Sequence, residues 1–183
     1  MTTRRDFIKT AALSSIGIAA GANAFSASSY RKIVGANDRV RVGIVGFSDR
    51  FRASLAPSFA EHAKALNFEI MGVSDIWNRR RDEAETFMKE KGWAANGFVK
   101  ARNNDELYAR KDVDAVIIST ADFQHALHCA EAVKSGRDVY VEKPFAETLE
   151  DGKIALKAVE NSKQIVQVGS QRRSAPNYHA AHD

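Results

Sequence analysis

The chain has 183 residues, 44% of them hydrophobic and 27% charged, a balance typical of a soluble globular protein. Its length predicts one domain and leaves room for the start of a second. The formal net charge of +4 arises from basic residues interspersed with acids, which excludes the one-signed basic stripe of nucleic-acid or membrane-surface binding. Cys129 is the single cysteine, so an intrachain disulfide and a cysteine zinc cluster are excluded, and we expect no metal site.

The first 27 residues have the three parts of a secretion signal. A basic start with Arg4 and Arg5 precedes a short apolar stretch. Ala22-Asn23-Ala24 offers one cleavage site, and Phe25-Ser26-Ala27 offers a competing one. The apolar stretch is shorter than the roughly 20 residues that a membrane-spanning helix needs. The paired arginines resemble a twin-arginine signal. We therefore expect residues 1–27 to be a signal peptide recognised by the twin-arginine export machinery, and the mature protein to be periplasmic or extracytoplasmic.

After a polar, patternless linker at 28–38, short apolar runs alternate with amphipathic stretches. We expect strands at 40–45, 68–73, 113–119, 138–141 and 165–168. We expect helices at 53–66, 78–91, 123–134 and from a capping box at Thr148 to residue 160, with a short helix opening at 104–106. This alternation predicts an α/β fold over 39–170, a doubly wound parallel sheet of the Rossmann type.

The turn after the first predicted strand is the expected phosphate site. A Rossmann domain places glycines there so that the chain turns tightly, the pyrophosphate approaches the backbone, and the helix packs on the strand. Gly46 and Phe47 begin this turn, but Ser48 and Phe51 stand at the second and third glycine positions. The Ser48 hydroxyl can still donate to a phosphate, whereas the Phe51 ring has to fit between helix and strand. A strand–turn–helix without a ligand is the alternative.

Asp75 ends the second predicted strand, where an acidic side chain accepts hydrogen bonds from the adenosine ribose. A carboxylate there repels a 2′-phosphate, so we expect NAD as cofactor, with NADP less favoured. Arg79, Arg80 and Arg81 follow closely enough to weaken that preference. The sequence therefore predicts a dinucleotide site that includes Gly46, Phe47, Ser48 and Asp75.

Three further segments follow predicted strands: residues 119–125 (Ser-Thr-Ala-Asp-Phe-Gln-His), Glu142-Lys143-Pro144, and residues 168–173. Together with the first strand and Asp75, they resemble the Gfo/Idh/MocA oxidoreductases over about residues 39–183. The Glu-Lys-Pro segment is the most specific element of this resemblance.

The resemblance implies roles for residues at the reactive end of the cofactor. Ser119 and Thr120 would line the nicotinamide ribose, and Glu142 and Lys143 would reach the nicotinamide. Lys143 would contact a substrate hydroxyl and join a proton relay, because a hydroxyl that loses hydride must also lose a proton. His125 is the second candidate catalytic residue, with an alternative role of orienting the backbone.

The function implied is hydride transfer between NAD and a carbohydrate or polyol hydroxyl. Two alternatives remain: an NAD-dependent glycosidase of the same fold that works by oxidation and elimination, and a non-catalytic nucleotide-binding fragment. The family's second, α+β substrate domain is essentially missing from the sequence, so we interpret residues 171–183 as the start of a truncated domain. Homo-oligomers are expected only where that domain is present.

Overall fold

The computed structural model describes residues 39–171 and 176–180. The predicted signal peptide at 1–27 and linker at 28–38 lie outside these residues. Among the residues described, no helix combines the length and apolar character needed to cross a membrane.

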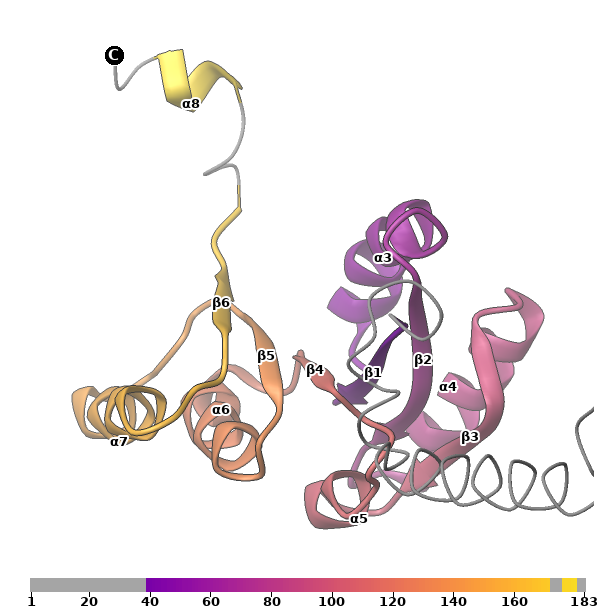
Figure 1. The fold of residues 1–183 in the computed structure, drawn as a ribbon, viewed down its shortest axis with the longest axis horizontal. Helices are drawn as coiled ribbons and strands as arrows, with labels where there is room; N and C mark the ends of the chain where they lie inside the picture. Colours follow the sequence, from indigo (N-terminus) through magenta and orange to yellow (C-terminus); the bar gives the residue numbers. More distant parts are fainter. Residues whose placement is uncertain (1–38, 172–175, 181–183) are drawn as a thin grey trace, which may run out of the picture. The chain divides into compact units, whose positions relative to one another are not determined.

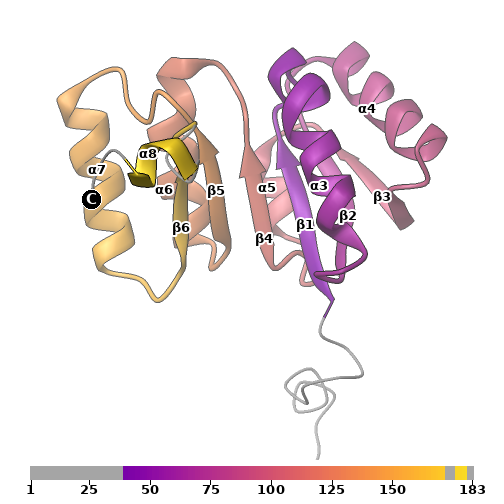
Figure 2. The ribbon, with the colours of Figure 1, turned by 90° about the horizontal axis from the view of Figure 1, so that it is seen from above.

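Six parallel strands form one sheet in the order β3-β2-β1-β4-β5-β6 (Figures 1 and 2). They are β1 (Val40–Val45), β2 (Phe68–Ser74), β3 (Ala94–Ala101), β4 (Ala115–Ile118), β5 (Asp138–Glu142) and β6 (Val166–Gly169). The order runs outward in both directions from β1 and β4, so the carboxyl ends of these two strands flank a topological switch point, where open parallel sheets bind ligands. The predicted doubly wound parallel sheet is confirmed.

Helices cover both faces of this sheet. They are η1 (Phe51–Leu55), a π-helical segment that runs into α3 (Ala56–Ala63), α4 (Asn78–Glu90), α5 (Asn104–Tyr108), the 3₁₀ segment η2 (Asp122–Gln124), α6 (His125–Lys134) and α7 (Leu149–Glu160). A further short helix, α8 (Pro176–Ala180), follows β6 in the sequence. Adjacent residues of β1 point to opposite faces: Ile44 packs with side chains of η1, α3 and α4, whereas Val45 packs with those of α5 and α6. The sheet therefore has two apolar cores, one on each face.

Cys129 lies within the second of these cores. Its side chain is fully buried on α6, and burial raises the pKa of the thiol to about 11. A thiol that stays protonated at neutral pH packs as a small apolar side chain and is a poor nucleophile.

The strand β3 is the main feature that the hydrophobic pattern did not predict. Its sequence, Ala-Ala-Asn-Gly-Phe-Val-Lys-Ala, contains Asn96 and Gly97, and Gly97 has a φ of +83°. The strand is at the edge of the sheet, with an irregular register against β2. An edge strand has one partner and partly exposed faces, so its sequence lacks the continuous apolar run that marks central parallel strands.

Candidate functional site

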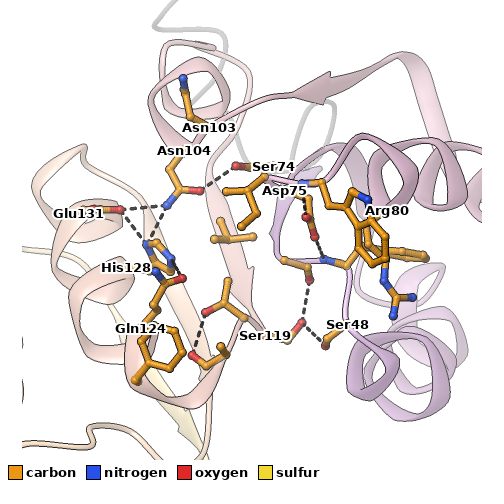
Figure 3. Close-up of a pocket in the computed structure, with 18 of the residues that line it drawn as sticks. Ser48, Ser74, Asp75, Arg80, Asn103, Asn104, Ser119, Gln124, His128 and Glu131 are labelled. Atoms are coloured by element: carbon orange, nitrogen blue, oxygen red, sulfur yellow. Dashed lines mark hydrogen bonds and ion pairs between the residues drawn. The ribbon is translucent and has the colours of Figure 1, made fainter.

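A cleft of about 1080 Å³ opens at the carboxyl ends of the central strands (Figure 3). Its walls come from the segments after β1, β2 and β4, from the start of α5, and from His128 and Glu131 of α6. Six of the predicted cofactor-binding residues line it together: Gly46, Phe47, Ser48, Asp75, Ser119 and Thr120. The cleft therefore lies at the switch point of the sheet.

The turn at Gly46 is held against the loop after β4. Gly46 has a φ of +84°, and its N–H donates to the carbonyl oxygen of Ser74 at 2.8 Å. A Cβ atom at this position would lie 2.7 Å from Cγ2 of Thr120. Only glycine fits this approach, because the backbone has a left-handed conformation and no space remains for a side chain.

Ser48 joins this turn to the helix that follows and to β4. Its Oγ accepts from the Phe51 N–H at 3.1 Å, as an N-cap does, and donates to Ser119 Oγ at 3.1 Å. Ser119 Oγ in turn donates to the Gly46 carbonyl oxygen at 3.0 Å. The amides of Asp49 and Arg50, in the first turn of the helix, have no hydrogen-bond partner within the described part of the chain. Free amides at a helix start bind anions.

The Phe51 ring lies in the core and leaves the phosphate turn open. The ring is fully buried and is not among the residues that line the cleft. Its centroid lies 5.8 Å from that of Phe47, whose ring also contacts Phe87 of α4. The helix is π-helical over Phe51–Leu55, so it carries one extra residue in this turn, as π-bulges do. Aromatic packing thus replaces the close approach of helix and strand that the third glycine normally allows.

The Asp75 carboxylate accepts hydrogen bonds from the backbone of two residues that line the cleft. Its Oδ2 accepts from the Phe47 N–H at 3.0 Å, and its Oδ1 accepts from the Trp77 N–H at 2.9 Å. Each carboxylate oxygen has a further lone pair, so both can still accept from a ribose hydroxyl. These two bonds fix the carboxylate beside the phosphate turn.

The three arginines after Asp75 are already engaged. The Arg79 guanidinium lies 3.8 Å from the centroid of the Trp77 ring, and Arg81 donates to the Asp75 carbonyl oxygen at 2.5 Å. Arg80 lines the cleft, where its Nη2 lies 3.2 Å from Asp49 Oδ1. A hydrogen bond from Arg52 and the charge of Arg80 hold the pKa of Asp49 below its usual value. A 2′-phosphate would therefore compete with carboxylates already in place.

A polar group that the sequence analysis missed forms the opposite wall. Asn104 Nδ2 donates to Glu131 Oε2 at 2.9 Å, and His128 Nδ1 lies 3.0 Å from the same oxygen. Burial would raise the pKa of Glu131, but the hydrogen bonds from Asn104 and His128 hold it below its usual value. The available signal was spacing, because Gln124, His128 and Glu131 recur on one helical face just after β4.

The predicted reactive-end residues lie outside this cleft. Glu142 is almost fully buried, and its Oε1 lies 3.2 Å from Nη2 of Arg50. Lys143 is exposed and has no ion-pair partner among the residues described. The Lys143–Pro144 peptide bond is cis. The structure therefore brings the predicted adenosine-side residues together, but it does not place Glu142 or Lys143 on the same cleft.

His125 is also outside the cleft. Its ring is buried, with Nδ1 2.8 Å from the Pro144 carbonyl oxygen and Nε2 3.2 Å from the Thr120 carbonyl oxygen. These contacts connect the loop after β4 to the Glu-Lys-Pro turn. Both ring nitrogens of His125 thus face backbone carbonyl oxygens.

Comparison with known proteins gives matches of both sequence and fold. Residues 40–170 match the model of the family described as "Oxidoreductase family, NAD-binding Rossmann fold" (GFO_IDH_MocA). The inositol 2-dehydrogenase of Agrobacterium fabrum is 31% identical over 145 residues, which cover 76% of this chain and 39% of that protein. A glycosyl hydrolase family 109 protein of Solibacter usitatus is 28% identical over 156 residues, covering 82% of this chain and 34% of that protein.

Among solved structures, the WlbA dehydrogenase of Bordetella pertussis, crystallised with NADH and UDP-GlcNAcA, has a TM-score of 0.66 at 24% identity. The match covers 78% of this chain and 40% of that one, and it shows a shared fold. The chain thus spans about two fifths of the length of the proteins it matches.

The close contact between Gly46 and Thr120 predicts that a methyl group added at position 46 destabilises the fold. Gly46→Ala should lower the free energy of unfolding by clearly more than the ~1–2 kcal/mol that a left-handed conformation alone costs an L-residue. The added cost comes from the contact with Thr120. Urea unfolding followed by circular dichroism measures the difference.

Gly97→Ala is the matched control. Gly97 has nearly the same φ, +83°, but no atom lies within 4 Å of a Cβ built on it. Equal losses of stability in the two variants would show that the approach of Thr120 does not constrain the turn.

Proposed function

The chain belongs to the oxidoreductase family with an NAD-binding Rossmann fold (Gfo/Idh/MocA), and we propose that its cleft binds the adenosine and phosphate portion of NAD for hydride transfer. The substrate we propose is a sugar or polyol hydroxyl, in keeping with the inositol 2-dehydrogenase relative. One observation carries the proposal: the phosphate turn at Gly46 and the Asp75 carboxylate face a single cleft at the switch point of the sheet.

The residues present fit a dinucleotide. The left-handed turn at Gly46 leaves no Cβ in the path of a ligand, and the free amides of Asp49 and Arg50 can donate to its pyrophosphate. Asp75 can accept from the ribose hydroxyls while its bonds to the Phe47 and Trp77 amides hold it in place. When bound, the cofactor supplies the hydride acceptor or donor.

At the reactive end we propose that Lys143 exchanges a proton with the substrate hydroxyl. Its neighbour Glu142 is ion-paired with Arg50, so the Lys143 amine is not tied to that carboxylate. We propose that His125 is a positioning residue, because its two ring nitrogens contact the carbonyl oxygens of Thr120 and Pro144. Through these contacts His125 would hold the conformation of the turn that contains Lys143.

A second reaction is favoured by the match to a glycosyl hydrolase family 109 protein. In such a glycosidase, transient oxidation of a sugar would permit elimination of the glycosidic bond, with no net change in the redox state of the cofactor. The same cleft and the same Lys143 would serve both reactions.

We also propose that residues 1–27 direct export by the twin-arginine route, and that the protein acts outside the cytoplasm. Support comes from the Arg4-Arg5 pair, the short apolar stretch and the small-x-small sequence after it. A protein exported in the folded state would carry its dinucleotide with it. This favours a tightly bound cofactor.

The carboxylate of Asp75 predicts the choice between NAD and NADP. Asp75→Asn should weaken NAD binding and lower the ratio of NAD to NADP affinity by roughly tenfold, because the charge that repels a 2′-phosphate is removed. Calorimetric titration of the chain with each dinucleotide measures both affinities. Asp112→Asn, made before the amino end of β4, is the control. An unchanged affinity ratio in Asp75→Asn would contradict the assignment, and a folded chain that binds neither dinucleotide would contradict the proposed function.

The oxidoreductase reaction and the glycosidase reaction are distinguished by their products. With polyols, we expect NADH to accumulate with the oxidised product, whereas a glycosidase would cleave glycosides without net NADH. Absorbance at the NADH band measures the net reduction of the cofactor, and chromatography of the released sugar measures cleavage of the glycoside. Lys143→Met should reduce turnover about a hundredfold, as loss of an acid–base group does, with little change in NAD affinity. Full turnover in this variant would remove Lys143 from the mechanism.

Export is tested with a reporter protein fused behind residues 1–38. The natural sequence should carry the folded reporter out of the cytoplasm, and replacement of Arg4 and Arg5 by lysine should retain it, as cell fractionation would show. Export that is unaffected by this replacement would argue against the twin-arginine route.

A further inference from the structure

One wall of the cleft consists of four polar side chains that are hydrogen-bonded to one another. We call Asn104, Gln124, His128 and Glu131 the α5–α6 wall. All four line the cleft, and Figure 3 shows them across it from Asp75 and Arg80. None is part of the phosphate turn or of the Glu-Lys-Pro segment, so the proposed function leaves them without a role.

Two members of the α5–α6 wall use their polar atoms within the protein. Asn104 Oδ1 accepts from Ser74 Oγ at 2.7 Å, and Asn104 Nδ2 lies 2.9 Å from both Glu131 Oε2 and His128 Nδ1. The His128 ring contacts Glu131 Oε2 through Nδ1 and Gln124 Oε1, at 3.1 Å, through Nε2. Asn104 and His128 are therefore positioning residues that hold the other two side chains.

The other two members, Glu131 and Gln124, each have one polar group that is not used in a hydrogen bond within the wall. Glu131 Oε1 and Gln124 Nε2 have no hydrogen-bond partner within the described ranges, and the Glu131 side chain is 52% exposed. The carboxylate oxygen can only accept, and the amide nitrogen can only donate. The wall thus offers the cleft one acceptor and one donor, both held by their neighbours.

This pair of groups is complementary to adenine. Adenine presents an exocyclic amine, a donor, next to a ring nitrogen that accepts, whereas a 6-oxopurine presents an oxygen in place of the amine. Asp75 directly follows Ser74, whose hydroxyl donates to Asn104, and Asp75 and the α5–α6 wall line the same cleft. A nucleotide with its ribose at Asp75 would therefore have this wall within the cleft that receives its base. The side chain of Ile76, 93% exposed at the cleft, offers an apolar surface for the face of a base.

We propose that the α5–α6 wall is a base-recognition subsite, in which Glu131 accepts a hydrogen bond from the exocyclic amine of adenine and Gln124 donates to the neighbouring ring nitrogen. This inference rests on the proposed function, since it assigns part of the same cleft. It makes the cleft selective for an adenine dinucleotide over its hypoxanthine analogue, because an oxygen at position 6 would face the Glu131 carboxylate.

The test compares NAD with nicotinamide hypoxanthine dinucleotide in calorimetric titrations of the full chain. The natural chain should bind NAD about tenfold more tightly than the analogue, as expected for a hydrogen bond to a charged group. Glu131→Gln should abolish or reverse this preference, because an amide can donate to the 6-oxygen. Glu160→Gln, the same change on the exposed end of α7, should leave the preference intact.

Circular dichroism and thermal unfolding verify that each variant is folded, and Glu131→Ala gives a second variant that removes the acceptor without adding a donor. Equal affinities of the natural chain for both dinucleotides, or an unchanged preference in both Glu131 variants, would overturn the base-recognition subsite while leaving NAD binding in place. Absence of binding by either dinucleotide would overturn the proposed function and, with it, this inference.

Discussion

The close approach of Gly46 to Thr120 is the constraint on which the cleft depends. The first turn after β1 and the loop after β4 meet there without a side chain between them, and Ser119 Oγ closes the contact with a bond to the Gly46 carbonyl oxygen. Because Ser48 bonds both Ser119 and the Phe51 amide, the same contact sets where the first helix begins. The free amides of that helix and the carboxylate of Asp75 are oriented by this one junction.

The central strands, and the convergence of Gly46 and Asp75 on one cleft, could be predicted from the sequence, because each rests on a local rule. Buried parallel strands have continuous apolar runs, and Gly46 and Asp75 follow two of them directly. The edge strand β3 could not be predicted in this way, since it has one partner and its apolar run is interrupted by Asn96 and Gly97. The position of the Phe51 ring also depends on tertiary packing. A π-helical turn and the rings of Phe47 and Phe87 accommodate it in the core, and no local sequence pattern predicts this arrangement.

The other contacts that the sequence did not predict join residues that are far apart in the sequence. In the α5–α6 wall, Asn104 of α5 contacts His128 and Glu131 of α6. These contacts are evident only once the order of the strands in the sheet is known, because that order brings the two helices together. Likewise, three successive arginines after Asp75 suggest a positively charged patch, but each is engaged by a ring, a carbonyl oxygen or a carboxylate. Sequence identifies these charges, and only the fold shows that they are already neutralised or bound.

The ion pair between Arg50 and Glu142 links two distant parts of the fold, the start of the first helix and the end of β5. The Glu142 carboxylate is 3% exposed, so removing the guanidinium alone would leave a buried, uncompensated negative charge, which is far more costly than exchanging both residues. Positions 50 and 142 therefore act as a single unit in sequence change. Loss of either side chain alone should therefore destabilise the fold more than loss of both, even though 91 residues of chain separate the two positions.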